Sequence, residues 1–559
     1  MSENSVNSSD LKQTVGYYLY DCLSSEGITE ILGVPGDYNF SLLDILEKYE
    51  GINFVNCHNE LNAGYAADAY ARVKGISALI TTFGVGELSA CNAIAGSYCE
   101  NVPVIHIVGG PKTKDQQAHK QMHHTLLDGD FDVFRKVYEH LTEYTSTITP
   151  ENAAFEIKAA IQKAKETKKP VYLLIATDIA NQPIINRDVN LTIKQTNQNS
   201  LQAAIQHIYK IITQAQRPVL LSGVHVSRYN LQTQVQQLVD KMNLPVATMM
   251  MGKGSFDESH KNFIGLYAGD LGSKEVQNIV ETSDCILAIG TMWSDYNTGS
   301  FTAKLNPLNI IELQPDSVKI GMAAYENILI QDMLNELLTR INKRMTNVPT
   351  APSPYVDVNI SLEEDVSSKY YYPRFQKMLK ENDILIADAG TFEFGIAQLK
   401  LPKGATYITQ GGWGSIGYGT PAAFGACIAA KNRRVILFVG DGSNQMTVQE
   451  FSSMLHNNCK PIIFLVNNKE YTIEKYLNVA QKNTHYNDLP LWDYSKLITA
   501  FGGESYTAKV YTNKELDEAI KKAEVQCNET LCLIEIYAPK MDAPPIVHKM
   551  TKMLEQMQK

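Results

Sequence analysis

Two polar residues, Asp441 and Asn468, each follow one of the most apolar segments of this 559-residue chain. Asp441 comes soon after residues 435–439, and Asn468 comes soon after residues 462–466. A carboxylate oxygen, an amide oxygen and a backbone carbonyl are ligands that suit a hard divalent cation holding phosphate oxygens. The pair therefore predicts a cation site that can anchor a phosphorylated molecule.

Two buried strands and one helix must position this pair. The apolar segments have the length of strands, and Val448, Phe451 and Met454 between them recur at helical spacing. A strand–helix–strand unit makes its two strands parallel and neighbouring. The carboxyl ends of such strands are where open α/β sheets bind ligands, so we expect both polar side chains at one edge of a sheet.

The segment Gly440-Asp441-Gly442-Ser443, together with Asn467-Asn468, resembles the signature of thiamine-diphosphate (ThDP) enzymes. The resemblance extends over nearly the whole chain, to the 2-oxo-acid decarboxylases of the pyruvate and indolepyruvate decarboxylase type. It implies an α/β protein with three doubly wound parallel-sheet domains. These are a pyrimidine-binding domain at 10–185, a middle domain at 200–345 and a diphosphate-binding domain at 360–545, followed by a helix over the active site at 546–559.

The same resemblance implies an oligomer. In the family the cofactor lies between the first domain of one subunit and the third domain of another. We therefore expect a homodimer at minimum, and a homotetramer built as a dimer of dimers.

The cofactors implied by the resemblance are ThDP and Mg²⁺. Asp441, Asn468 and the backbone carbonyl of Glu470 match the Mg²⁺ ligands, although the family often has glycine where Glu470 stands. The carbonyl of Gly414 is implied to accept from the aminopyrimidine, and Ile416 to wedge the cofactor into a V shape. Further cofactor contacts are implied at Glu60, Thr82, Thr391, Gly442, Ser443 and Ile473.

Glu60 is the candidate activator of the cofactor. It lies between a predicted strand at 52–55 and a helix rich in small residues. A lone glutamate at a helix start is usually favoured by the helix dipole. By resemblance, Glu60 is instead the carboxylate that hydrogen-bonds N1′ of the pyrimidine, so that the cofactor becomes its own base.

Four residues, Asp37, His123, His124 and Glu474, match the proton-handling group of the family. After CO₂ leaves, one carbon must gain a proton and the product alcohol must lose one. Carboxylic groups and imidazoles with separated pKa values serve both steps. Taken singly these residues are ordinary turn, cap or surface groups, but together they favour a decarboxylase over carboligating synthases and lyases with the same fold.

The predicted substrate is a 2-oxo acid, and the pocket matches favour pyruvate. Tyr296 and Ile473 are bulky, whereas Met550 and Leu554 on the terminal helix are adaptable and leave branched-chain or aromatic 2-oxo acids open. A methylene changes selectivity by only about 1–3 kcal/mol. Glu393 stands where relatives often carry a small or aromatic residue; either its pKa is raised beside the substrate, or it points away into a salt bridge.

Composition limits the partners. The chain has 50 Lys and Arg against 60 Asp and Glu, a net charge of −10, which argues against nucleic acid or an anionic membrane. No apolar run approaches the ~20 residues of a membrane span. The polar start and the nine scattered cysteines without a C-x-x-C motif favour a reduced, cytoplasmic protein.

A rival interpretation is an NAD-dependent oxidoreductase. Residues 79–83 followed by Gly84-Val85-Gly86 imitate the strand, glycine loop and helix of a dinucleotide site. Ser89 replaces the third glycine, however, and Glu87 would place a negative charge against the pyrophosphate. A non-catalytic relative is the other rival, and it would lack the proton-handling residues that this chain retains.

Overall fold

The computed structural model describes residues 11–557 except 186, 188, 351–359 and 482–483. Two compact units divide the chain. The first contains Met1–Ile193, Thr420–Asn432 and Thr447–Cys459, and the second contains Lys194–Gly419, Arg433–Met446 and Lys460–Lys559. The first unit holds one β-sheet and the second holds two, so the described residues confirm three α/β sheets. The predicted domain boundaries remain predictions.

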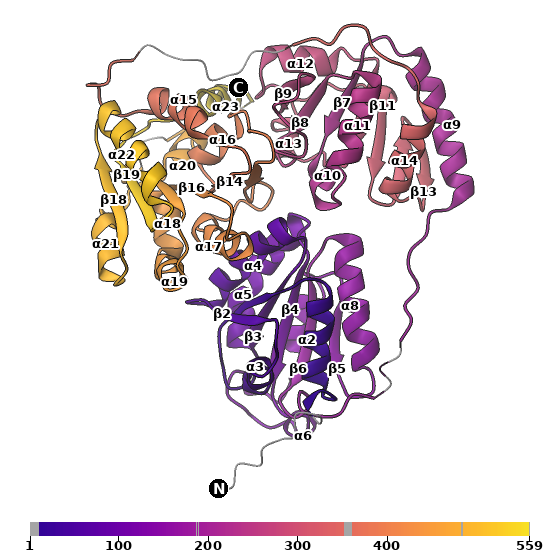
Figure 1. Ribbon diagram of the computed structural model, residues 1–559, viewed down its shortest axis with the longest axis vertical. Helices are drawn as coiled ribbons and strands as arrows, with labels where there is room; N and C mark the ends of the chain where they lie inside the picture. Colours follow the sequence, from indigo (N-terminus) through magenta and orange to yellow (C-terminus); the bar gives the residue numbers. More distant parts are fainter. Residues whose placement is uncertain (1–10, 186, 188, 351–359, 482–483, 558–559) are drawn as a thin grey trace. The chain divides into compact units, whose positions relative to one another are not determined.

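The sheet of the first unit has the strand order β2-β1-β3-β4-β6-β5, and every pair is parallel (Figure 1). Its strands are β1 (Glu30–Gly33), β2 (Asn53–Asn56), β3 (Ser77–Thr82), β4 (Val104–Gly110), β5 (Thr145–Ile148) and β6 (Val171–Ala176). The helices are α2 (Val15–Ser25), α3 (Phe40–Leu46), α4 (Glu60–Lys74), α5 (Val85–Cys99), α6 (Thr113–Gln117), α7 (Val133–Tyr138) and α8 (Ala153–Thr167).

Alternating side chains place helices on both faces of this sheet. Ala78 and Ile80 of β3 belong to the apolar cluster that α2, α3 and α8 complete. Leu79 points the other way and lies beside Gly64 of α4. A side chain at Gly64 would stand 2.5 Å from Ala93 of α5, so small residues let α4 and α5 pack closely. This packing brings the starts of α4 and α5 together.

The first sheet of the second unit has the order β13-β12-β11-β10-β7-β8-β9. Its elements are α9 (Gln198–Gln214), β7 (Pro218–Ser222), α10 (Val224–Arg228), α11 (Gln232–Met242), β8 (Val246–Met249), β9 (Phe263–Tyr267), α12 (Lys274–Glu281), β10 (Cys285–Ile289), α13 (Asp295–Thr298), a 3₁₀ turn (Pro307–Asn309), β11 (Ile310–Gln314), β12 (Ser317–Ile320), β13 (Ala323–Glu326) and α14 (Ile330–Arg340).

This sheet is parallel except at one edge, where β11–β12 and β12–β13 are antiparallel. The reason lies in the connections. Pro315 and Asp316 alone join β11 to β12, and Gly321 and Met322 alone join β12 to β13. A parallel crossover needs about a dozen residues, so these short links allow only hairpins.

The third sheet has the order β15-β14-β16-β17-β19-β18 and is parallel throughout. The elements of this part of the chain are α15 (Ser368–Met378), β14 (Ile384–Ala387), α16 (Thr391–Ala397), β15 (Thr406–Ile408), α17 (Gly419–Ala429), β16 (Val435–Gly440), α18 (Asp441–Thr447), α19 (Glu450–His456), β17 (Ile462–Val466), α20 (Thr472–Leu477), a 3₁₀ turn (His485–Asn487), α21 (Tyr494–Ala500), β18 (Ser505–Val510), α22 (Asn513–Gln526), β19 (Leu531–Ile536) and α23 (Pro545–Met557). Of these, α17 from Thr420 onward and α19 belong to the first unit.

The strand pairing predicted for the polar pair is confirmed. β16 and β17 are parallel neighbours, with Gly440 opposite Val466, so Asp441 and Asn468 leave the sheet at the same edge. The single helix predicted between them was wrong. The chain forms α18 and α19, because the carbonyls of Val448 and Gln449 accept from N–H groups three residues on and tighten the turn. Within the described residues, no helix is long and apolar enough to span a membrane.

Candidate active site

The predicted site residues divide between the two units. Asp37, Glu60, Thr82, His123 and His124 lie in the first unit. The second unit holds the other predicted residues, which are Tyr296, Thr391, Glu393, Gly414, Ile416, Asp441, Gly442, Ser443, Asn468, Glu470, Ile473, Glu474, Met550 and Leu554.

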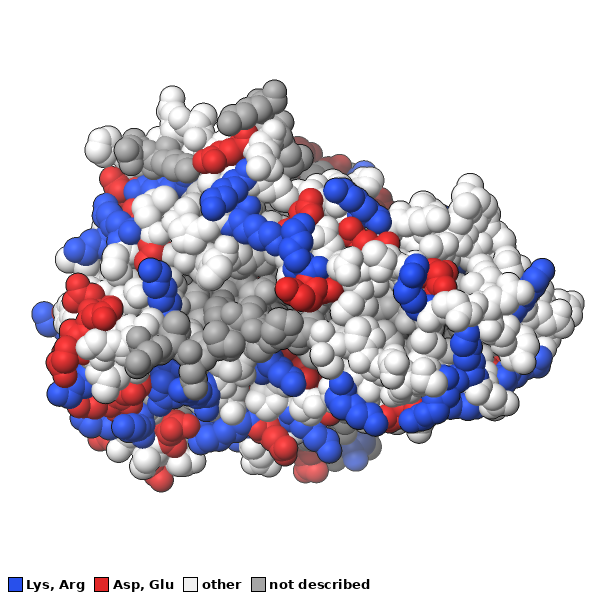
Figure 2. Space-filling view, turned by 90° about the horizontal axis from the view of Figure 1, so that it is seen from above, with Lys and Arg blue, Asp and Glu red and all other residues white. Residues whose placement is uncertain are grey.

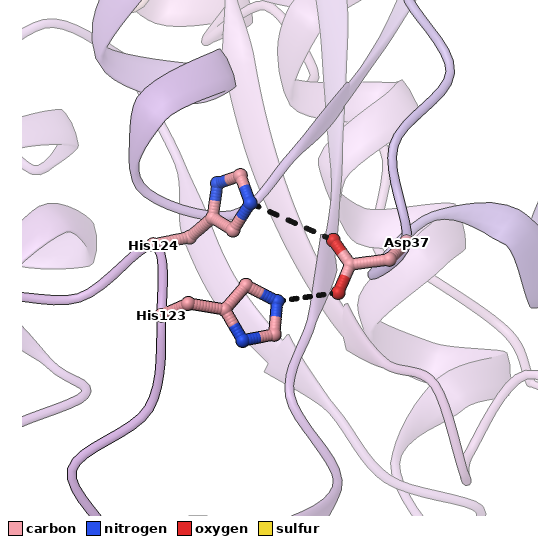
Figure 3. A group of neighbouring side chains, drawn as sticks. All are labelled: Asp37, His123 and His124. Atoms are coloured by element: carbon pink, nitrogen blue, oxygen red, sulfur yellow. Dashed lines mark hydrogen bonds and ion pairs between the residues drawn. The ribbon is translucent and has the colours of Figure 1, made fainter.

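The structure brings Asp37, His123 and His124 together (Figure 3). Nε2 of His123 lies 2.6 Å from Oδ2 of Asp37, and Nε2 of His124 lies 3.8 Å from Oδ1. Tyr38 supports this group, since its ring stacks on His123 with centroids 5.0 Å apart and its hydroxyl donates to the His123 carbonyl at 3.2 Å. The three side chains are partly exposed, so they can exchange protons with a bound molecule.

The turn that carries Asp37 is fixed by neighbours that sequence reasoning did not single out. The buried side chain of Asn39 accepts from the N–H of Gly36 at 2.9 Å and donates to the carbonyl of Val34 at 3.0 Å. A Cβ on Gly36 would lie 2.6 Å from Cβ of Thr82, so only glycine lets this turn rest on the end of β3. A glycine directly before Asp37 was the available signal.

Glu60 is the first residue of α4, and Asn59 caps that helix by accepting the N–H of Asn62 at 2.8 Å. A Cβ on Gly86, at the start of α5, would lie 3.1 Å from Oε1 of Glu60 and 3.0 Å from Cγ2 of Thr82. Glycine therefore leaves space beside both side chains. The hydroxyl of Thr82 is buried and has no hydrogen-bond partner among the described residues. Because an unsatisfied buried hydroxyl costs about 1–3 kcal/mol, it is ready to bond a ligand.

Glu450 of α19 holds the residues on either side of Glu60. Its Oε1 accepts from the N–H of His58 at 3.0 Å and from the side-chain amide of Asn62 at 2.9 Å. Nδ1 of His58 lies 2.9 Å from the hydroxyl of Ser453. Glu450 is fully buried, and a lone charged residue beside Phe451 and Met454 is the sequence signal that could have found it.

Asp441 is a buried carboxylate held by backbone donors. Its Oδ1 accepts from the N–H of Gly442 at 2.9 Å, and its Oδ2 accepts from the N–H of Lys469 at 2.7 Å. Burial raises the pKa of Asp441 to about 6, against the opposing effect of these hydrogen bonds. No lysine or arginine of the described chain forms an ion pair with it. A buried carboxylate without a counter-charge is what a cation site requires.

Glu470 keeps its side chain away from any cation. Its Oε2 accepts from Nζ of Lys475 at 2.6 Å, and its Oε1 accepts from the N–H of Met541 at 2.6 Å. The Glu470 carbonyl accepts one N–H, that of Thr472, and a carbonyl has a second lone pair for a metal. Asn468 donates its amide to the Thr472 hydroxyl at 2.6 Å, and its side-chain oxygen accepts from the N–H of Glu470 at 3.4 Å. The donor set fits a hard cation through oxygen atoms alone.

Two glycines, Gly442 at the start of α18 and Gly414, belong to the predicted cofactor-binding segments. A side chain at Gly442 would collide with the ring of Tyr471, so the second glycine of the Gly-Asp-Gly segment is required by packing. The hydroxyl of Ser443 donates to the carbonyl of Ala389 at 3.4 Å, just before the helix α16 that begins at Thr391. Gly414 has φ +69 and donates its N–H to the carbonyl of Gln410 at 2.6 Å, while Ile416 is half-buried.

The substrate-pocket candidates share one apolar cluster. Met550 belongs to it, and Tyr296, Ile473 and Leu554 pack against it. Glu393 is buried and accepts a hydrogen bond of 2.5 Å from the Tyr296 hydroxyl, an arrangement that sequence reasoning did not anticipate. Glu474, next to Ile473, is exposed on α20.

The segment Gly84–Glu87 does not form a dinucleotide site. Oε1 of Glu87 accepts from the N–H of Gly84 at 2.7 Å, so the helix start is already bound to the carboxylate of its own chain. Oε2 accepts from the hydroxyl of Tyr172 at 2.8 Å. Since a pyrophosphate needs these same N–H groups, this arrangement removes the basis of the oxidoreductase interpretation.

Three family models match the chain. The thiamine pyrophosphate enzyme N-terminal TPP binding domain matches residues 13–131, the central domain matches 205–341, and the C-terminal TPP binding domain matches 388–536. Among curated relatives, pyruvate decarboxylase of Aspergillus fumigatus is 40% identical over 95% of each chain. Pyruvate decarboxylase isozyme 3 of Saccharomyces cerevisiae is 38% identical over 97% of this chain and 98% of its own.

Proposed function

Because this chain belongs to the pyruvate decarboxylase family of thiamine pyrophosphate enzymes, we propose that it decarboxylates pyruvate to acetaldehyde and CO₂ with ThDP and Mg²⁺. The observation that carries this proposal is the group in which two imidazoles face the carboxylate of Asp37. Such a group provides the proton transfers that must follow the loss of CO₂. The relatives named above support pyruvate as the substrate.

The residues at the end of β16 fit the Mg²⁺ and diphosphate part of the cofactor. Asp441, Asn468 and the carbonyl of Glu470 would hold the ion, and the buried charge of Asp441 would be neutralised by it. Gly442 and Ser443 would face the diphosphate at the start of α18. When bound, ThDP supplies the carbanion and the electron sink for decarboxylation.

The protein groups would manage protons. Glu60 would hold a proton against the pyrimidine, in the space that Gly86 leaves beside it. Nε2 of His123 and Oδ2 of Asp37 lie 2.6 Å apart, within hydrogen-bond distance, so this pair would pass protons in successive steps. The buried hydroxyl of Thr82 would form a hydrogen bond to the bound ligand. Glu474 of the second unit, exposed on α20, is a further residue proposed to handle protons.

We also propose a homodimer at minimum, assembled as a homotetramer. Supporting this, α5 exposes Val85 and Leu88 beside the glycine turn, and the loop after His124 exposes Leu126 and Leu127. Large apolar side chains gathered next to a functional site are typical of a surface that another subunit covers.

A cytoplasmic location, and a small-molecule 2-oxo acid as partner in place of nucleic acid or a membrane, complete the proposal. All nine cysteines are free thiols, which suits a reducing compartment. Acidic and basic side chains are interspersed over the face drawn in Figure 2, rather than gathered into one basic patch. With the net charge of −10, this supports neither nucleic acid nor an anionic membrane as a partner.

A broader range of branched-chain or aromatic 2-oxo acids is the second candidate, because Met550 and Leu554 form an adaptable part of the apolar cluster. A coupled aldehyde assay over pyruvate, 2-oxoisovalerate, phenylpyruvate and indolepyruvate separates the two. We expect the highest kcat/KM with pyruvate and no aldehyde without ThDP and Mg²⁺. A higher kcat/KM with indolepyruvate would favour the second candidate, and no turnover of any acid would refute both.

A further inference from the structure

We propose that Asp37, His123 and His124 bind a divalent transition-metal ion such as Zn²⁺, at a site separate from the Mg²⁺ ligands proposed around Asp441. One ligand atom from each of the three residues lies within 4.8 Å of the others. Figure 3 shows the two rings turned toward the same carboxylate. Two imidazoles and one carboxylate, with a fourth position open to water, form a common zinc ligand set.

The distances in this group fit the ion closely. Zinc bonds to imidazole nitrogen and carboxylate oxygen are about 2.0–2.2 Å long, so tetrahedral neighbours stand about 3.3 Å apart. The observed separations from Asp37, 2.6 Å to His123 and 3.8 Å to His124, lie on either side of that value. Because the three ligand atoms lie within 4.8 Å of one another, shifts of up to about 1.5 Å in these partly exposed side chains would form the site.

An outer contact favours the required tautomer of His123, whereas Nδ1 of His124 is buried without a hydrogen-bond partner among the described residues. Both histidines face Asp37 through Nε2, so Nδ1 must carry the ring proton when Nε2 binds a metal. Nδ1 of His123 lies 3.4 Å from the hydroxyl of Tyr38, which can accept that proton as a hydrogen bond. Such outer-shell hydrogen bonds orient a metal-binding imidazole and raise its basicity.

Ligand chemistry separates this site from the Mg²⁺ site. Imidazole nitrogen suits Zn²⁺, Cu²⁺ and Ni²⁺, whereas Mg²⁺ prefers the all-oxygen donors around Asp441. Asp37, but neither histidine, lines an open cavity of about 530 Å³, so a hydrated ion can reach this carboxylate. A bound ion would occupy Oδ2 of Asp37 and Nε2 of His123, the two atoms proposed to transfer protons, so it should inhibit the enzyme. This inhibition rests on the proposed function, but the binding does not.

Equilibrium dialysis of the chelator-treated, ThDP-free full chain against zinc chloride tests the site, with reductant present to keep the thiols reduced. We expect His123→Gln and His124→Gln to bind one zinc fewer per chain, or to bind that zinc at least about 100-fold more weakly. This loss of affinity exceeds the one that removal of an outer-shell hydrogen-bond partner causes. The control His140→Gln changes an exposed histidine of the same unit and should bind as the wild type.

Equal zinc binding by wild type and both variants would overturn the proposal. Should either histidine variant fail to fold by circular dichroism, Asp37→Asn provides the same comparison. In the activity arm, zinc should inhibit at the concentration at which it fills this site, and a chelator should restore turnover with Mg²⁺ present. A chain that binds zinc here but decarboxylates no 2-oxo acid would refute the proposed function and leave the metal site standing.

A different observation carries a second inference: Glu87 is a positioning residue for His124 and Glu60. Its carboxylate is fully buried and holds the N–H of Gly84, the residue before α5. Gly84 has φ +62, and a side chain there would collide with the carbonyl of His124. Two residues on, Gly86 faces Oε1 of Glu60. The start of α5 thus contacts both the backbone of His124 and the side chain of Glu60.

Glu87 is itself braced on both sides. Tyr172 donates to its Oε2 at 2.8 Å, and the hydroxyl of Tyr138 donates to its backbone carbonyl. The rings of Tyr138 and Tyr172 stack with centroids 4.7 Å apart. Removing the carboxylate would free Gly84 from its unusual conformation and let the helix start move.

Kinetics of Glu87→Ala and Glu87→Gln test this role. A misplacement of about 1 Å costs about 100-fold in rate, so we expect Glu87→Ala to lower kcat about 100-fold while KM changes little. Glu87→Gln keeps an acceptor oxygen and should restore most of kcat. In the ThDP-free chain, diethyl pyrocarbonate should label His124 faster in Glu87→Ala than in wild type.

A matched control is Glu30→Ala, which removes another buried carboxylate that accepts from a tyrosine, Tyr70, in the same unit. It should lose similar stability but keep kcat and His124 labelling. Full activity in folded Glu87→Ala, or equal impairment of Glu87→Gln, would overturn the role. If Glu87→Ala does not fold, Tyr172→Phe removes the outer brace, and unchanged kcat and labelling in that variant would overturn the role as well.

Discussion

Asp37 and Asp441 are both aspartates placed just beyond a parallel strand, yet their surroundings are opposite. The side chain of Asp37 is 42% exposed and meets two imidazoles. Asp441 is 3% exposed and meets backbone N–H groups. An exposed carboxylate with titratable partners can pass protons, whereas a buried one with fixed partners can only hold a positive charge. The contrast fits the proposal that one group would serve the chemistry and the other cofactor retention.

Replacing Asp441 is the most severe way to test this contrast. Asp441→Ala removes the only charged ligand proposed for the cation, so we expect ThDP affinity to fall by more than about 100-fold. Fluorescence titration with ThDP at fixed Mg²⁺ measures it. Wild-type affinity in the presence of a chelator would show that retention does not depend on a metal at Asp441.

Replacing His123 should have a smaller effect of a different kind. His123→Gln breaks the 2.6 Å bond to Asp37 and removes a titratable group, so kcat should fall about 100-fold. The ThDP affinity should stay within about twofold of the wild-type value, because the residues proposed to hold Mg²⁺ and the diphosphate are unchanged. If ThDP affinity fell as far as in Asp441→Ala, the two groups would not have separate roles.

The pH dependence of cofactor retention sharpens the contrast further. The pKa of Asp441 is raised from 3.8 to about 6, so a proton competes with Mg²⁺ below that pH. Retention should weaken about tenfold for each pH unit below 6. The stability of the cation-free protein should depend on pH in the opposite direction to cofactor retention. Its free energy of unfolding should decrease as pH rises from 3.8 to about 6, because the folded state binds the extra proton.

The Asp441 side of the comparison was largely predictable from the sequence, because it is local. One strand–helix–strand unit fixes where Asp441 and Asn468 emerge, and apolar periodicity reveals the strands. The break between α18 and α19 was not predictable from periodicity, since Val448 within the break keeps helical spacing to Phe451 of α19. The hydrogen bonds that tighten this turn leave no mark on the apolar pattern.

Contacts between distant residues were the larger gap. Glu87 had been considered only as an obstacle to a pyrophosphate, yet its partner Tyr172 is 85 positions away in the chain. Glu393 was expected to carry a raised pKa or to form a salt bridge, and Tyr296, its partner here, is 97 positions away. The hydrogen-bond donor of a buried carboxylate is set by tertiary contacts, and a single sequence does not say which strand or helix carries that donor.

Glu393 adds a third case, a carboxylate that is buried like Asp441 but accepts a hydrogen bond from the hydroxyl of Tyr296. Tyr296→Phe removes that donor, so the free energy of unfolding should fall by about 1–3 kcal/mol, measured by denaturant titration. Tyr296→Ala also removes a ring from the apolar cluster. The kcat/KM for longer 2-oxo acids should therefore rise relative to that for pyruvate, by a factor that corresponds to about 1–3 kcal/mol. Since Tyr296→Phe keeps the ring, it should keep the substrate preference, and it serves as the control for size. A preference unchanged in Tyr296→Ala would mean that this residue braces Glu393 and does not select the substrate.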